Sequence, residues 1–280
     1  MNTDSSLVEM IHKHLTTKRV KLPAFNATAL RIQKEIAKEE PDTRMIEKSI
    51  VSDQSLTGEV LRVSNSSFYK GLSQVATVRD AIIRLGYKEV ANIVTLVTLQ
   101  HNFQSKDPVV HKIMGKLWRH SVGCAMGANW LAKQTGFQPI CHETFIAGLL
   151  HDVGKLFILK AIDDMKASGE IDDRPSDTLI DEAMLNLHAE QGNSLLNHWN
   201  LPQKYCRIAR DHHIEDFDCN NLLLVLVRLA NHMCHKKGIG LCEDPSFALM
   251  ATPEAHQLQL SEVDMARLEV LLEDSQVLSG

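Results

Sequence analysis

Apolar residues recur at three- and four-residue spacing through most of the 280-residue chain, which is the period of one buried face of an α-helix. Alternation of apolar and polar residues over the length of a strand is hard to find. The pattern therefore predicts an all-α protein. In the first part of the chain, short helical segments are broken at Pro23, Pro41, Gly71 and Gly86, which predicts a compact helical N-terminal lobe.

A polar run from Gln104 to Pro108 separates this lobe from a long helix that we expect over Val109 to Gly136, because proline suits the first turn of a helix. In the last part, Ser261 and Asp264 have the spacing of a capping box and predict a final amphipathic helix. These breaks predict an N-terminal lobe, a second helical lobe and a helical tail, at residues 1–107, 108–245 and 246–280.

The second lobe should contain several further helices. One is expected to start near Glu143 and to stop at Gly154, where glycine can adopt the left-handed cap. Another is expected to begin at Thr178 and Asp181, which have capping spacing. The segment 222–233 is apolar enough to be the central buried helix.

Charge and composition narrow the functional classes. Lys and Arg number 30 against 35 Asp and Glu, and the basic residues are spread out, so there is no electrostatic basis for a nucleic-acid or anionic-membrane partner. No stretch approaches the ~18 apolar residues that span a bilayer, and the first residues lack a signal-peptide pattern. Six scattered cysteines without a Cys-x-x-Cys motif suit a reducing compartment. We therefore expect a cytoplasmic protein.

Several histidines fall at the ends or on the inward faces of separate predicted helices. Imidazole nitrogens together with a carboxylate suit Mn²⁺, Fe²⁺, Zn²⁺ or Co²⁺. Any one of these histidines alone would be explained more simply as a hydrogen-bonded helix residue, but their recurrence on different helices favours one shared metal site. The candidate ligands are His120, His151, Asp152, His188, His212 and His213.

Such a site could support hydrolysis of a phosphate ester, because open coordination positions would hold a water molecule that the metal acidifies. We assign catalytic roles to Asp152 and to Lys155, which follows three residues later and could balance the charge of a phosphate. Alternatively, Lys155 is a solvated charge at a helix end, where the helix dipole favours it.

Two other clusters are weaker candidates for a functional site. His232, Cys234 and His235 mix soft and imidazole ligands, but they lie on different faces of a helix, which disfavours a second metal site. Cys141 and His142 are neighbours in sequence and have no third group to orient them, so a buried thiol is favoured over a nucleophile and its base.

The segments Arg119-His120-Ser121 and Leu149 to Lys155 resemble the HD superfamily of metal-dependent phosphohydrolases. The chain is more similar overall to the HDOD family, the HD-related output domain, from about residue 22 to residue 235. This resemblance is found in the segments 53–56, 60–66, 81–86, 188–192 and 195–202.

The resemblance implies an all-helical HD-like bundle with a helical N-terminal lobe, and a regulatory role in bacterial signal transduction. HDOD domains often lack some HD catalytic ligands. The six candidate ligands stand where HD-GYP proteins carry theirs, but the closing aspartate is replaced by Asn231. Its carbonyl can coordinate a metal without adding negative charge, so we expect weaker binding and slower turnover. No Gly-Tyr-Pro follows His213, so cyclic-dinucleotide hydrolysis is not implied.

Two main hypotheses follow. The first is a signalling module that presents a surface to a protein partner, with a retained divalent metal (Mn, Fe, Zn, Co or Mg) or another ligand setting the positions of its lobes. The second is a metal-dependent phosphohydrolase acting on a nucleotide or another small phosphate ester. A structural scaffold that has lost the metal is a third, weaker hypothesis.

Overall fold

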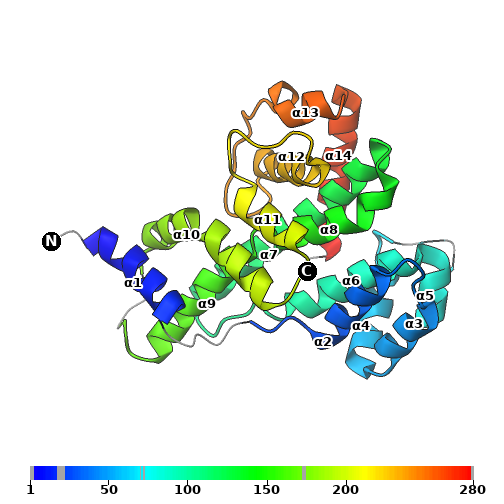
Figure 1. Ribbon diagram of the computed structural model, residues 1–280, viewed down its shortest axis with the longest axis horizontal. Helices are drawn as coiled ribbons and strands as arrows, with labels where there is room; N and C mark the ends of the chain where they lie inside the picture. The colour runs from blue at the N-terminus through cyan, green and yellow to red at the C-terminus, as the bar shows by residue number, and fades with distance from the viewer. Residues whose placement is uncertain (1–2, 18–22, 70, 72, 172–174, 279–280) are drawn as a thin grey trace.

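The computed structural model describes residues 3–17, 23–69, 71, 73–171 and 175–278, and these residues form helices and no strand (Figure 1). The prediction of an all-α fold is therefore confirmed. The α-helices are α1 (Thr3–Thr17), α2 (Ala27–Ile36), α3 (Thr43–Val51), α4 (Gln54–Ser64), α5 (Val78–Leu85), α6 (Tyr87–Gln100), α7 (Pro108–Gln134), α8 (Cys141–Leu150), α9 (Val153–Ala167), α10 (Asp177–His198), α11 (Gln203–Asp211), α12 (Leu222–Lys236), α13 (Pro253–Gln257) and α14 (Glu262–Ser275). Short 3-10 turns lie at Gln138–Ile140, Leu249–Ala251 and Gln276–Leu278.

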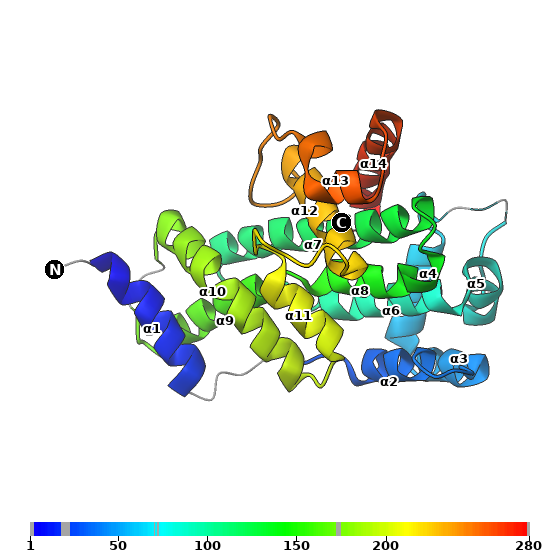
Figure 2. The same cartoon turned by 45° about the horizontal axis from the view of Figure 1, so that its top comes forward.

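Helix α7 runs along the middle of the molecule, and α8, α12 and α14 pack against it (Figure 2). It begins where the sequence predicted, because the Asp107 side chain accepts hydrogen bonds from the first backbone amides and Pro108 occupies the first turn. Its 27 residues span about 40 Å. A Cβ atom on Gly127 would lie 3.2 Å from the Cβ of Ala230, so glycine allows α12 to approach closely.

The N-terminal helices α2 to α6 form one end of the molecule (Figure 1). Each of α2 to α5 starts at a side-chain cap, provided by Asn26, Asp42, Asp53 and Thr77. Helix α6 is mostly buried and contacts α8 of the second lobe. Buried apolar residues from both lobes form one continuous core, and the domain boundaries remain a prediction.

Helix α1 packs against α9 and α10, at the other end of the molecule from α2 to α5 (Figures 1 and 2). His14 on its buried face lies 3.3 Å from Asp164 and 3.2 Å from Glu170. In the tail, α14 begins at the predicted capping box of Ser261 and Asp264. It packs along α7, so the tail contributes to the core around the central helix.

The predicted cap at Gly154 is wrong. Helix α8 ends at Leu150, and α9 begins at Val153, so Gly154 lies inside α9 and has no left-handed backbone. Its role is instead to permit contact between helices: a Cβ atom there would lie 1.9 Å from the carbonyl oxygen of His188 on α10. A glycine at this position therefore brings α9 and α10 together.

The predicted start of α10 is also wrong. Ser176 is the N-cap, and its hydroxyl accepts a hydrogen bond from the Leu179 amide. Thr178 lies within the first turn. The serine, two residues earlier than the predicted cap, is the better capping residue, and the helix therefore starts at Asp177.

Candidate metal centre

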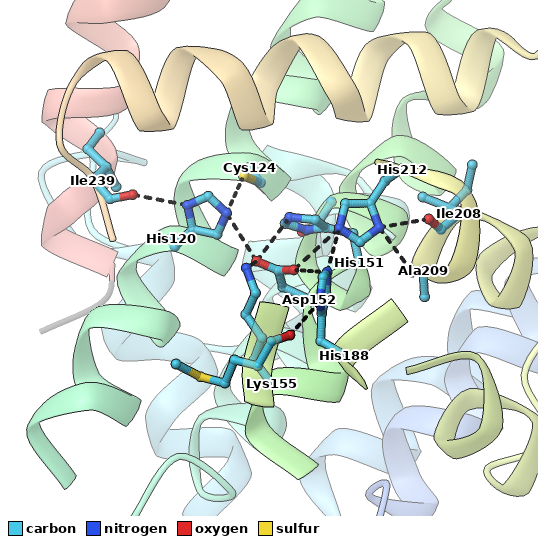
Figure 3. Close-up of polar contacts among 12 residues, drawn as sticks. His120, Cys124, His151, Asp152, Lys155, His188, Ile208, Ala209, His212 and Ile239 are labelled. Atoms are coloured by element: carbon cyan, nitrogen blue, oxygen red, sulfur yellow. Dashed lines mark hydrogen bonds and ion pairs between the residues drawn. The ribbon is translucent and has the colours of Figure 1, made fainter. Parts of the chain in front are cut away.

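Four helices deliver imidazoles to one buried carboxylate, that of Asp152 (Figure 3). His120 comes from the middle of α7 and His188 from the middle of α10, while His212 caps the end of α11. His151 and Asp152 occupy the two-residue break between α8 and α9. All five residues are between 1% and 3% exposed. The structure therefore gathers these five predicted ligands in the interior.

The imidazoles divide between the two oxygens of Asp152. The Nε2 atoms of His120 and His151 lie 3.4 Å and 3.5 Å from Oδ2. The Nε2 atoms of His188 and His212 lie 3.6 Å and 3.4 Å from Oδ1. The carboxylate therefore stands between two groups of nitrogen atoms, and it belongs to both sets of potential ligands.

Backbone carbonyls fix the tautomer of each of these histidines, because a carbonyl can only accept a hydrogen bond. The Nδ1 atom of each ring must therefore carry the proton, which leaves the Nε2 lone pair directed at Asp152. The four acceptors are the carbonyl oxygens of Ile239 for His120 (3.0 Å), Gly148 for His151 (2.8 Å), Met184 for His188 (2.6 Å) and Ala209 for His212 (3.0 Å).

The protonation states match this arrangement. Burial lowers the pKa of His120 and His212 to about 4 and that of His151 to about 3, and it also lowers the pKa of His188. Burial alone would raise the pKa of Asp152, but the Lys155 ammonium group beside it holds that pKa well below its usual range. At neutral pH, uncharged lone pairs therefore face an ionised carboxylate.

Two buried polar atoms of the cluster, Nε2 of His151 and Oδ1 of Asp152, lack a hydrogen-bond partner among the described residues. Leaving such atoms without a partner is costly, and both are acceptors that a cation would satisfy. Neutral imidazole and carboxylate ligands suit first-row divalent metals. The buried cluster is therefore consistent with a metal site.

Lys155 is the cation that contacts Asp152 in the structure. Its Nζ atom lies 2.7 Å from Oδ2, and its side chain is 14% exposed. The residue lies in the first turn of α9, where the helix dipole disfavours a positive charge. The alternative of a dipole-stabilised surface lysine is therefore wrong, and the ion pair with Asp152 holds the side chain. Its role towards a phosphate remains a prediction.

The two remaining predicted ligands differ in their surroundings. His213 is exposed, and its ring lies 4.1 Å from that of His212 and 5.0 Å from that of His188. It could close the group formed by Asp152, His188 and His212. Asn231 is buried on α12, and no hydrogen bond joins its side-chain oxygen to another described residue. Its role as a ligand remains a prediction.

His120 has three neighbours that the sequence did not connect to it: Cys124, which was not considered, and Cys234 and His235, which were considered only as part of a separate cluster. The Sγ atom of Cys124 lies 3.5 Å from the Nε2 atom of His120, and Cys234 is close enough to share a metal ion with both. The ring of His235 stacks on His120 at 5.2 Å. The four-residue spacing of His120 and Cys124 was a usable signal, because such residues share a helix face.

A buried arginine holds the backbone beside His212. Arg228 on α12 donates hydrogen bonds to the carbonyl oxygens of His212 (2.7 Å) and Ile214 (2.9 Å), and its Nε atom lies 2.5 Å from Glu254 of α13. Sequence reasoning did not identify this link. The signal was that Arg228 is the single charged residue in the apolar segment 222–233, since a charge in a buried helix needs a partner.

The opening to the cluster is narrow. A cavity of about 10 Å³ reaches Asp152, and His120, Lys155, His235 and Leu241 are among the residues that line it. This volume corresponds to about one water molecule. The passage therefore has room for a water or a bare ion, and not for a nucleotide.

Comparison of the sequence with known proteins identifies a family and a relative. A family model described as HDOD domain matches residues 22–215. An uncharacterized protein of Treponema pallidum (strain Nichols) is 28% identical over 201 residues, which cover 69% of this chain and 37% of that protein. The chain thus spans little more than a third of this relative.

Solved structures share the fold. An HDOD domain protein with unknown function from Geobacter sulfurreducens has a TM-score of 0.74 at 23% identity, covering 97% of this chain and 95% of its own. A protein of Shewanella amazonensis SB2B, named as a proposed metal-dependent phosphohydrolase, has a TM-score of 0.74 at 17% identity and full coverage of both chains. One of Marinobacter aquaeolei VT8, named as a proposed signal transduction protein, has a TM-score of 0.69 at 22% identity, covering 99% of this chain and 64% of its own.

Among the described residues, no helix combines the length and the apolar character needed to cross a bilayer.

Proposed function

The chain belongs to the HDOD domain family, and on that premise we propose that it is a bacterial signal-transduction protein whose buried cluster binds one or two divalent cations. The ion has a structural or sensory role, and the protein acts through a surface that it presents to a protein partner. The observation that supports this role most directly is the cavity of about 10 Å³ at Asp152, which is too small for a phosphate ester.

The cluster is suited to report whether an ion is bound. Its ligands come from α7, α10, α11 and the break between α8 and α9, so an ion would connect elements that are far apart in sequence. A divalent cation supplies a fixed positive charge and Lewis acidity. Without it, the Nε2 lone pairs and Asp152 repel one another. Loss of the ion should therefore shift these helices, and a partner can sense that shift.

Two further features favour regulation over catalysis. Asn231 replaces a carboxylate by a neutral amide, which weakens the hold on a cation. Most of the donors, His120, His151, Asp152 and His188, are also nearly inaccessible to solvent, as suits a structural ion with a closed coordination shell.

The alternative function is a metal-dependent phosphohydrolase acting on a nucleotide or another small phosphate ester. Its support is that Lys155 borders the opening and is partly exposed, so its ammonium group could bind a phosphate oxygen while Asp152 and the imidazoles hold the cation. His213, exposed at the edge of the cluster, is the imidazole best placed to exchange a proton with solvent.

Metal analysis and an activity assay separate these functions. The protein is purified without chelators, its metal content is measured by mass spectrometry, and hydrolysis of bis(p-nitrophenyl) phosphate and a nucleotide panel is assayed with Mn²⁺. The variants are Asp152→Ala and, as a control, Asp181→Ala, which removes an exposed carboxylate of α10.

We expect bound metal, no turnover, and loss of the metal in Asp152→Ala alone. Metal-dependent turnover that Asp152→Ala abolishes would establish the phosphohydrolase instead. Absence of any bound metal, even after incubation with Mn²⁺, Fe²⁺ or Zn²⁺, would show that the histidines form a metal-free core.

A further inference from the structure

A second cavity, of about 410 Å³, lies between the two lobes and is separate from the metal centre. Helices α2 and α6 of the N-terminal lobe and helices α8 and α11 of the second lobe contribute to its walls. Apolar and aromatic side chains cover much of the interior, among them Phe25, Leu30, Ile146, Leu201 and Tyr205. Its volume falls in the range of small-molecule sites, about 300–1,000 Å³.

His142 provides a buried polar group in this cavity. It is 8% exposed, and its Nε2 atom lies 2.8 Å from Oε1 of Gln33 on α2, so the pair joins the two lobes. The other ring nitrogen, Nδ1, is buried without a hydrogen bond of ordinary geometry among the described residues, although the Lys88 backbone lies close to the ring. A buried ring nitrogen without a partner is rare in a folded protein, and a polar group of a bound molecule would satisfy it.

The rim of the cavity is positively charged. Lys34, Lys88 and Lys204 line it together with one carboxylate, Glu143. Lys204 and Glu143 pair at 2.8 Å, whereas Lys34 and Lys88 form no ion pair within the described part of the chain. Helices α8 and α11 begin at this rim, and neither has a side-chain cap at its first turn. The positive ends of both helix dipoles therefore add to the charge of the lysines.

We propose that this cavity binds a small amphipathic anion, which places an apolar or aromatic body between the lobes and one carboxylate or phosphate group at the rim. The apolar walls favour burial of the body. The uncommitted lysines and the two helix N-termini favour the anionic group over a neutral one. Binding at this cavity does not depend on the metal centre.

Two helices connect this cavity to the metal centre. In α8, His142 lies in the first turn at the cavity, and His151 caps the other end at the metal centre, about 15 Å away. In α11, Gln203 to Tyr205 line the cavity, and His212 caps the far end. A ligand that moves the first turn of either helix therefore also moves a metal ligand. This coupling, unlike the binding itself, rests on the proposed function.

A matched pair of fluorescent probes tests the binding. The probes are 8-anilinonaphthalene-1-sulfonate and N-phenyl-1-naphthylamine, which share an aromatic body but differ in the anionic group. We expect saturable binding of the sulfonate at one site, at least about tenfold tighter than that of the neutral probe. Equal affinity for both probes, or no saturable binding of the sulfonate, would overturn the proposal.

Variants locate the probe. The double variant Lys34→Glu and Lys88→Glu should weaken sulfonate binding about tenfold or more, whereas Lys112→Glu, an exposed position on α7 outside the cavity, should leave it unchanged. Ala37→Trp places a large side chain at an exposed position of the cavity wall and should abolish binding. Circular dichroism checks that each variant is folded. Undiminished binding in folded Ala37→Trp would place the probe elsewhere and overturn the proposal.

Calorimetry with Mn²⁺ tests the coupling. With the sulfonate probe bound, the dissociation constant for Mn²⁺ should change by about threefold or more, and reciprocally Mn²⁺ should change the affinity for the probe by the same factor. In Ala37→Trp the shift should vanish. An unchanged constant would overturn the coupling alone. Failure to bind Mn²⁺ at all would contradict the proposed function, while the fluorescence titrations would still decide whether the cavity binds the anion.

Discussion

Lys155 and Asp152 face each other one helical turn apart, and the ammonium group of the lysine lies 2.7 Å from Oδ2 of the carboxylate. The same oxygen faces the Nε2 atoms of His120 and His151. A cation that uses these imidazoles must therefore share Oδ2 with Lys155 or displace it. The lysine acts as a built-in competitor of the metal.

Removing this competitor should strengthen metal binding. We expect Lys155→Gln to lower the dissociation constant for Mn²⁺ about tenfold, because one positive charge close to the ion is removed. Isothermal titration calorimetry measures the change. Lys166→Gln is the control on the same helix, since Lys166 pairs with Asp107 away from the cluster. Weaker binding in Lys155→Gln would show that the lysine instead organises Asp152 for the metal.

A carboxylate at position 231 should make the thermal stability of the protein depend on bound metal. In the absence of metal, Asn231→Asp buries a charge without a partner, so we expect the melting temperature to fall by several degrees. Added Mn²⁺ should recover more than the loss. In the control Asn129→Asp, the amide that donates to the Cys141 carbonyl is lost, and no metal rescue is expected. Thermal melts with and without Mn²⁺ check both outcomes. Absence of rescue in Asn231→Asp would exclude position 231 from the site.

The C-terminal tail should support the metal centre, because its residue Glu254 pairs with Arg228, which in turn holds the backbone of His212. Because Glu254 is 1% exposed and its pKa is lowered to about 2, its ion pair with Arg228 is buried and charged. Although burial alone would raise this pKa, His232 and Arg228 lower it. We expect Arg228→Met to reduce the free energy of unfolding by about 3 kcal/mol and to weaken Mn²⁺ binding, because the His212 backbone is released.

Urea denaturation and calorimetry check this prediction for Arg228→Met. The matched control is Lys237→Met, which removes the more exposed pairs with Glu269 and Glu273. It should change the free energy of unfolding by less than about 1 kcal/mol. If metal affinity survives in a folded Arg228→Met protein, the arginine supports only the tail.

The contact between α9 and α10 should depend on Gly154. A methyl group at this position would overlap the carbonyl oxygen of His188, so Gly154→Ala must push the helices apart and displace two parts of the cluster. We expect a loss of about 3 kcal/mol or more in the free energy of unfolding. Gly115→Ala on α7 is the control, because nothing lies within 4 Å of a Cβ atom there and alanine favours the helix. An equal effect of both substitutions would contradict the steric explanation.

Stability without metal should fall in acid. The pKa of His120 and His212 is lowered from 6.5 to about 4 by burial, and that of His151 to about 3. As the pH drops below 6.5, the unfolded chain therefore binds protons before the folded one does. Stability that is fully present above pH 6.5 should be lost towards pH 4, by about 1 kcal/mol per pH unit for each histidine.

Urea denaturation in chelating buffer between pH 7 and pH 5 measures this slope. His212→Gln should make the dependence shallower, because one of the buried histidines is removed. The control is His101→Gln, which removes a histidine whose side chain is 60% exposed and lies outside the cluster. A slope that is identical in all three proteins would show that groups outside the cluster dominate the acid sensitivity.

The helical fold was predictable because its signals are local. Apolar periodicity marked α7 and α12, and Pro108 and the pair of Ser261 and Asp264 marked two helix starts. The convergence of the histidines was inferred from their positions on separate predicted helices, and the motif resemblance supported it. The errors at Gly154 and Thr178 arose where two local signals competed, since a glycine can serve as a cap or as a close contact, and only the position of α10 decides between them.

The remaining parts of the site depend on tertiary contacts. Cys234 and His235 approach His120 across the α7 and α12 interface, and the segment's own pattern did not show which face of α12 meets α7. The carbonyl that orients the His120 ring, that of Ile239, lies 119 residues away in sequence. Backbone acceptors have no residue-type signal, so no motif could identify them.

The narrow opening at Asp152 also determines how fast an ion could leave. A hydrated cation carries about six waters, whereas the cavity of about 10 Å³ lined by His120, Lys155 and Leu241 has room for about one. Exchange would then require transient local opening of the fold, which is slow compared with diffusion. Uptake and release of an ion by this route would therefore follow the rate of those opening motions, and titrations with metal would need long equilibration after each addition.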